Sequence, residues 1–285
     1  MAKMNKHGKR QRLQISPAAR RDVIGSSSAC LQCQEPGCTG GCPIGVGVPS
    51  VLTLVSSGRL EEAATLLRLR SPLASITGRL CPSGRFCEHA CVLSRKGAPV
   101  SVHTIEAFLG DMSLGLPVKR GKTATGKILV VGSGPAGLMA AHDLHADGFK
   151  VKVIERQSLI GGCLRHPPTA VIPPGILDSE LKRLVKSGIA FETSRPFETK
   201  DGFPPEGYTA IVLTTGLPGP NENPFPLKRD ADGFVVVDPN YVASLPRVYA
   251  AGGAISSYDN ITEAMASARE MVGHLLRAQL FPATA

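Results

Sequence analysis

The residues of this chain that are best suited to chemistry are its cysteines. Seven of the eight cysteines lie in the first third of the 285 residues, in two groups. The first group reads C-x2-C-x4-C-x3-C-P and comprises Cys30, Cys33, Cys38 and Cys42. The second group has five and then three intervening residues and comprises Cys81, Cys87 and Cys91. Cysteines clustered in this way more often bind metal than form disulfides when the compartment is reducing.

Two metal chemistries suit these spacings. Structural zinc sites usually bring two close C-x2-C pairs to one ion, and here only Cys30 and Cys33 form such a pair. Iron–sulfur clusters fit better, because the first group is close to the ferredoxin run, in which the last cysteine before proline serves the other cluster. Seven thiolates then divide into a set of four and a set of three that needs a ligand of another residue type. We therefore expect two [4Fe-4S] clusters, with zinc as the alternative.

A second candidate site lies between Gly126 and Arg156. A short apolar run ends in the sequence GSGPAG, an apolar-periodic segment follows, and a second apolar run closes on an acidic residue. This pattern predicts a βαβ dinucleotide site, in which glycines allow the tight turn, the approach to a pyrophosphate and close helix packing, while the acid binds a ribose. The alternative is a glycine turn that serves packing alone. The residues expected at the nucleotide are Gly132, Gly134, Pro135, Ala136, Gly137 and Glu155.

The chain resembles the small subunit of glutamate synthase. The resemblance rests on the two cysteine groups, on GRLCP at residues 78–82, on CEHAC at residues 87–91 and on PVSVHTIEAFLGD at residues 99–111. It is similar also to the amino-terminal half of dihydropyrimidine dehydrogenase and to the larger subunit of the ferredoxin:NADP transhydrogenase.

The resemblance implies how the cysteines divide between the two clusters. One cluster would be held by Cys30, Cys33, Cys38 and Cys91, and the other by Cys42, Cys81, Cys87 and Glu106. A carboxylate oxygen is a competent though harder ligand for iron, so the second cluster would have an unusual, low reduction potential. The alternative for Glu106 is an ordinary solvated helix residue.

The resemblance also implies that the nucleotide is FAD rather than NAD. The family places a glycine pair and a leucine against the FAD pyrophosphate and ring, a glycine turn after a later strand, and the start of the last helix against the flavin. The corresponding residues are Gly161, Gly162, Leu164, Gly216, Gly253 and Thr262. Cys163 lies in the same loop, with no remaining cysteine to pair with, and we expect it to be a small buried side chain.

Two departures from the family pattern matter. The family inserts a second Rossmann domain for NADPH after the glycine turn, whereas only about thirty residues separate Gly216 from Val248, fewer than such a domain needs. The family also has an aspartate that bonds the ribityl chain where this sequence has Gly253. The first departure predicts that no pyridine-nucleotide domain is inserted here, and the second weakens the case for FAD.

The predicted fold class is α+β/α/β. We expect a basic arm (1–25), a small α-helical ferredoxin-like domain with two [4Fe-4S] clusters (26–120), and a Rossmann-type FAD domain without an NAD(P)H domain (121–285). Periodicity predicts helices over 59–70, 179–188 and 261–280, the last beginning with a capping box at Asn260. Further strands are expected at 189–193, 210–214 and 234–237.

Charge and composition exclude several classes of protein. The net charge is +9, and most of the excess lies in the N-terminal arm, which is expected to be poorly ordered, with docking on an acidic partner as the sharper alternative. Aromatic residues do not interleave its charges, so nucleic-acid binding is not expected. The arm lacks the apolar segment of a secretory signal, and no run approaches the ~20 apolar residues of a membrane span. These features predict a cytoplasmic protein.

We expect an oxidoreductase subunit for electron transfer, which relays electrons between partner redox subunits through FAD and the two clusters and carries no catalytic residue for a substrate. One alternative is a compact flavin reductase that oxidises NAD(P)H. The other is a structural subunit that has lost its cofactors, motivated by Gly253.

Overall fold

The computed structural model describes residues 16–122, 124–166, 171–173, 175–197, 205–217 and 225–280. Most of the expected basic arm, residues 1–15, lies outside this part of the chain. The end of the arm is helical, because Ser16 accepts a hydrogen bond from the backbone N–H of Ala19 and Pro17 occupies the first turn of the helix. Val23 on this helix is buried, so residues 17–25 belong to the folded protein.

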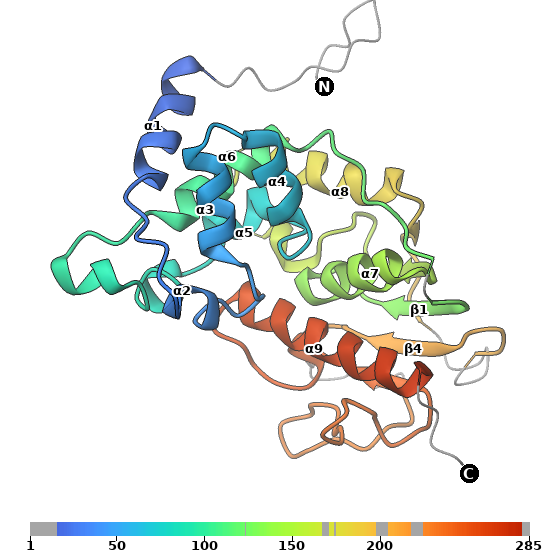
Figure 1. The fold of residues 1–285 in the computed structure, drawn as a ribbon. Helices are drawn as coiled ribbons and strands as arrows, with labels where there is room; N and C mark the ends of the chain where they lie inside the picture. The colour runs from blue at the N-terminus through green and yellow to red at the C-terminus, as the bar shows by residue number, and fades with distance from the viewer. Residues whose placement is uncertain are drawn as a thin grey trace, which may run out of the picture.

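The N-terminal half is helical (Figure 1). Its elements are α1 (Pro17–Ser27), α2 (Gly37–Gly40), α3 (Val48–Ser56), α4 (Leu60–Arg68), α5 (Ala74–Leu80), η1 (Ser83–Arg85), η2 (Val92–Lys96) and α6 (Val102–Met112). The predicted helix at 59–70 is confirmed as α4, with Glu61 and Glu62 in its first turn and Arg68 in its last, which suits the helix dipole.

Helices α5 and α6 pack with their backbones in contact. A side-chain Cβ at Gly78 would lie 2.3 Å from the backbone nitrogen of Ala107, and a Cβ at Gly110 would lie 2.3 Å from that of Ser75. Glycine at these two positions therefore sets the spacing of the two helices, which carry cluster-ligand candidates on their facing segments.

The C-terminal half is a Rossmann-type sheet with helices. Its elements are β1 (Lys127–Val131), α7 (Pro135–Asp147), β2 (Lys150–Ile154), η3 (Gly162–Arg165), α8 (Ile176–Lys186), β3 (Ala190–Glu192), β4 (Ala210–Leu213), β5 (Val248–Ala250), η6 (Gly252–Ala254) and α9 (Ile261–Leu280). The strands are parallel in the order β3-β2-β1-β4-β5, with Val130 opposite Val153 on β2 and Val212 on β4. α9 has 20 residues, yet neither it nor any other helix in the described ranges is long and apolar enough to cross a bilayer.

The two faces of the sheet are covered differently. Ile128 and Val130 of β1 face the main core with α7 and α9, while Leu129 and Val131 face a second core formed with Phe225, Leu227 and Val235. The connection between β4 and β5 thus covers the far face of the sheet. The predicted strand at 234–237 is wrong, because this segment makes only one isolated bridge, between Arg229 and Val235. Val235 and Val237 pack against the face of the sheet instead, and Val236 between them is exposed.

A buried ion pair joins the two halves. The Glu180 carboxylate on α8 lies 2.7 Å from the Arg68 guanidinium on α4 and accepts a hydrogen bond of 3.0 Å from the backbone N–H of Ser75. Burial alone would raise the pKa of Glu180, but the guanidiniums of Arg68 and Arg183 hold it below its usual value. A lowered carboxyl pKa stabilises the fold above the pKa of the unfolded state, and that contribution is lost as the pH falls through the folded-state value.

Replacing Glu180 tests this connection. Glu180→Ala would strand two buried guanidiniums, so we expect the free energy of unfolding to fall by about 3 to 5 kcal/mol in urea titrations at neutral pH. The matched control is Glu62→Ala, which removes the exposed pair with Arg59 and should leave the urea midpoint unchanged. Equal midpoints for both variants would contradict the role given to Glu180.

Candidate functional site

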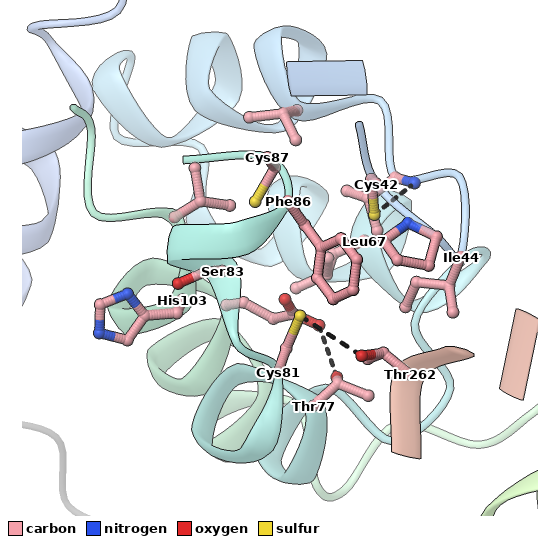
Figure 2. A pocket seen from close by; sticks show the side chains of 15 residues that line it. Cys42, Ile44, Leu67, Thr77, Cys81, Ser83, Phe86, Cys87, His103 and Thr262 are labelled. Carbon is pink, nitrogen blue, oxygen red and sulfur yellow. Dashed lines mark hydrogen bonds between the residues drawn. The ribbon is translucent and has the colours of Figure 1, made fainter. Parts of the chain in front are cut away.

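Two cavities in the helical half collect the cysteines. The first, named here the Glu106 cavity, has a volume of about 30 Å³. Figure 2 shows Cys42, Cys81 and Cys87 converging on it from separate segments, after α2, at the end of α5 and after η1. The rest of the wall is largely apolar and includes Leu67 and Phe86. Three of the candidate ligands therefore face one enclosed space with Glu106.

Glu106 is oriented into this group by two hydroxyls. Its Oε1 accepts hydrogen bonds from Ser71 (2.6 Å) and Thr77 (2.5 Å), and no hydrogen bond from the described residues reaches Oε2. Burial raises the pKa of the Glu106 carboxyl, although the two hydroxyls and Arg68 act in the opposite direction. The interpretation of Glu106 as a solvated helix residue is wrong, because the side chain lines the cavity with the three cysteines.

The second cavity, named here the Cys38 cavity, also has a volume of about 30 Å³. It is lined by Cys30, Cys33, Cys38 and Cys91, with Cys87 between the two cavities. The short α2 lies against the segment that carries Cys91, since a Cβ at Gly37 would stand 2.8 Å from the Ala90 carbonyl oxygen. Apart from Cys87, which lines both cavities, the two cavities separate the residues as the resemblance assigns them to two clusters.

Burial raises the pKa of four thiols in these cavities, those of Cys38, Cys42, Cys81 and Cys87. Burial raises the pKa of Cys81 to about 12 and also raises that of Cys87, and nearby cysteines and Glu106 add to both shifts. Burial, followed by Cys30 and Cys91, raises the pKa of Cys38. Such groups ionise together only when a cation balances them, which is the situation of iron-bound thiolates. No three His, Cys, Asp or Glu residues in the described ranges are arranged to hold a single metal ion.

The glycine-rich loop after β1 has the geometry of a nucleotide cradle. Gly132 has a positive φ of 100°, and a Cβ at Gly137 would lie 2.1 Å from the Gly132 carbonyl oxygen, so both glycines are required by the turn. Gly134 caps α7 with an ordinary φ of −69°, and a Cβ there would meet nothing within 4 Å. Pro135 and Ala136 open the helix and are buried. The open space therefore lies where a phosphate would approach the helix end.

Glu155 is buried at the end of β2 and binds the same loop. Its carboxylate accepts hydrogen bonds from the backbone N–H (2.9 Å) and hydroxyl (2.6 Å) of Ser133 and from the N–H of Gln157 (2.9 Å). A carboxylate offers about four acceptor positions, so one remains for a ribose hydroxyl. The sequence pattern did not predict that Ser133 donates two hydrogen bonds to the Glu155 carboxylate.

The segment 161–164 closes over the loop. A Cβ at Gly162, where φ is 53°, would lie 2.8 Å from the Cα of Gly134, and the Leu164 side chain is buried. The prediction that Cys163 is buried is wrong, because Cys163 is exposed on the surface. Residues 162–165 form a 3-10 turn that buries Leu164 and leaves its neighbour on the outside.

The remaining flavin candidates lie at the ends of β4 and β5. Gly253 is in contact with the turn after β4, since a Cβ on it would stand 3.0 Å from the carbonyl carbon of Gly216 and 3.1 Å from the nitrogen of Leu217. The turn therefore leaves little room for the aspartate of the family. Thr262 at the start of α9 is buried and lines the Glu106 cavity, a location that the resemblance did not foresee.

Two family models match this chain. Residues 10–116 match a model described as dihydropyrimidine dehydrogenase domain II, 4Fe-4S cluster, and residues 130–185 match one described as NAD(P)-binding Rossmann-like domain. These matches confirm the predicted order of a ferredoxin-like helical domain and a Rossmann-type domain.

Curated relatives confirm the predicted resemblance. The glutamate synthase [NADPH] small chain of Escherichia coli K12 is 30% identical over 253 residues, which cover 83% of this chain and 51% of the relative. The glutamate synthase [NADPH] small chain of Azospirillum brasilense is 29% identical over 247 residues, which cover 82% of this chain and 50% of the relative. The NAD-dependent dihydropyrimidine dehydrogenase subunit PreT of Escherichia coli O157:H7 is 27% identical over 223 residues, which cover 76% of this chain and 53% of the relative. The chain therefore spans about half the length of these relatives.

The geometry of the loop predicts that alanine is destabilising at Gly137 and tolerated at Gly134. Gly137→Ala would push a methyl group into the backbone of Gly132, so the free energy of unfolding should fall by at least the ~1 to 3 kcal/mol of an overpacked site. Gly134→Ala adds a methyl group in open space and should stay within ~0.5 kcal/mol of the parent. Urea unfolding followed by circular dichroism compares them, and equal losses would contradict this geometry.

Proposed function

We propose that this chain is an electron-transfer subunit of an oxidoreductase, which holds one FAD and two [4Fe-4S] clusters and relays electrons between partner redox subunits. The observation that carries the proposal is the gathering of seven cysteines and Glu106 around two neighbouring cavities, with Cys87 lining both. The resemblance to glutamate synthase small chains over more than four fifths of the chain supports it.

In this proposal Cys30, Cys33, Cys38 and Cys91 hold one cluster, and Cys42, Cys81, Cys87 and Glu106 hold the other. When bound, the clusters supply one-electron steps and the flavin joins these to two-electron steps. The chain contributes a carboxylate whose Oε1 is already held by Ser71 and Thr77, which leaves Oε2 for iron. The remaining wall is mostly apolar and surrounds the ligands with Leu67 and Phe86.

The nucleotide is proposed to be FAD, bound above Gly134 with its ribose on Glu155. The family model for this half is described as NAD(P)-binding, and the glycine loop alone suits either nucleotide. The contact of Gly162 with Gly134 favours FAD, because the resemblance implies that the 161–164 segment is a feature of flavin-binding relatives.

Electrons are proposed to enter and leave through partner proteins. β4 and β5 are neighbours in the sheet, and the short connection between them covers its far face. Only about thirty residues separate Gly216 from Val248, so no pyridine-nucleotide domain is proposed at this position, and a hydride donor is proposed to act on another subunit. All eight cysteines are free, which suits the reducing cytoplasm.

The second candidate function is a compact flavin reductase, favoured by the NAD(P)-binding description of the second family model. Stopped-flow mixing of the anaerobic protein with NADH or NADPH separates the two functions. Rapid bleaching of the flavin by the isolated chain supports the reductase, and an unbleached flavin supports the relay.

Anaerobic purification tests the proposed cofactors directly. We expect about eight irons, about eight sulfides and about one FAD per chain. Gly134→Ala should lose flavin and keep iron, because its methyl group occupies only the space proposed for the phosphate. Flavin without iron, or zinc in place of iron, would refute the relay, and a colourless protein after reconstitution would support a structural subunit.

Glu106→Ala tests the eighth ligand. We expect iron to fall from about eight to about four per chain, with unchanged flavin, because only the second cluster loses a ligand. Thr104→Ala is the matched control, since this exposed residue lies on the same helix. If the Glu106 variant keeps about eight irons, the carboxylate is not a ligand.

A further inference from the structure

A hydroxyl of the sheet half points at a candidate cluster ligand of the helical half. The Thr262 Oγ1 lies 3.6 Å from the Cys81 Sγ, within hydrogen-bond distance for sulfur, and Figure 2 shows this contact across the wall of the Glu106 cavity. Thr262 is 1% exposed, so water does not compete for the bond. The two residues are 181 positions apart in the sequence.

We propose that Thr262 is a positioning residue that hydrogen-bonds the Cys81 thiolate and thereby raises the reduction potential of the second cluster. This inference rests on the proposed function, because it presupposes that Cys81 binds iron. Reduction adds negative charge that spreads onto the ligand sulfurs, so a hydroxyl donor stabilises the reduced form more than the oxidised one.

The Thr262 hydroxyl has a choice of two acceptors. It also lies 2.6 Å from the Asn260 Oδ1, which accepts a hydrogen bond of 3.0 Å from the backbone N–H of Glu263 as well. A hydroxyl carries one proton, so the bond to Asn260 weakens as the charge on the Cys81 sulfur grows. The contact therefore responds to the redox state of the cluster.

The contact exists only while α9 is docked on the helical half. The Arg269 guanidinium on α9 donates hydrogen bonds to the carbonyl oxygens of Arg70 (2.6 Å) and Ile44 (2.5 Å), and it also pairs with Asp143 on α7. These hydrogen bonds hold α9 against the segments that follow α2 and α4, and α9 also contacts α5. The sheet half thus supplies a group that acts on a cluster of the helical half.

Redox titration followed by electron paramagnetic resonance tests the proposal on the anaerobic protein. In Thr262→Val the reduction equilibrium constant of one cluster should fall about tenfold, which corresponds to about 59 mV for one electron, while that of the other cluster stays unchanged. Thr262→Ser keeps the hydroxyl and should retain the parent potentials. Thr65→Val makes the same change on an exposed helix surface and should leave both potentials unchanged.

A second variant keeps the test decisive if Thr262→Val fails to hold its second cluster. Asn260→Ala leaves Cys81 as the acceptor for the hydroxyl, so the same potential should rise. Unchanged potentials in a variant that retains about eight irons overturn the role of Thr262 and leave the relay standing. A parent protein without iron overturns both.

Discussion

The arrangement of the two halves depends on the buried carboxylate of Glu180. A buried charge is tolerated only when it is paired and hydrogen-bonded, and Glu180 finds Arg68 and the backbone of Ser75 in the opposite half. Arg68 in turn donates to the Gly110 carbonyl oxygen and the Ser113 hydroxyl on and just after α6. One ionic contact therefore joins α8 to the three helices that surround the Glu106 cavity, and the halves cannot rotate apart without exposing it.

The same region explains how a small helical domain builds a cavity for charged ligands. Gly78 and Gly110 let α5 and α6 approach closely, which brings Cys81 at the end of one helix near Glu106 on the other. The hydroxyls of Ser71 and Thr77 then fix one carboxylate oxygen and leave the other toward the sulfurs. Close backbone contact between α5 and α6, together with the buried apolar core around them, sets the geometry of this site.

The sequence predicted the local features well, because they depend on nearby residues. The glycine loop, the strands around it and α4 follow from spacing and periodicity. The division of the cysteines between two clusters is implied by the resemblance and stays a prediction. Features set by distant packing were missed. The exposure of Cys163 depends on which neighbour the 3-10 turn buries. In the segment 234–237, Val235 and Val237 pack against the face of the sheet. The contact of Thr262 with Cys81 joins segments that are 181 positions apart in the sequence. An alternating apolar pattern, as at residues 234–237, or a single threonine in the sequence does not tell which distant residues it will contact.

The contact between Gly253 and the turn after β4 couples the residue at position 253 to the path of the chain at residues 216–217. The backbone of Gly216 and Leu217 lies where a side chain at residue 253 would begin, because a Cβ there would stand 3.0 Å from the carbonyl carbon of Gly216. A side chain at this position therefore requires the turn to shift by a few tenths of an ångström. A variant that adds an acidic side chain at residue 253 has to alter the turn at residues 216–217 as well.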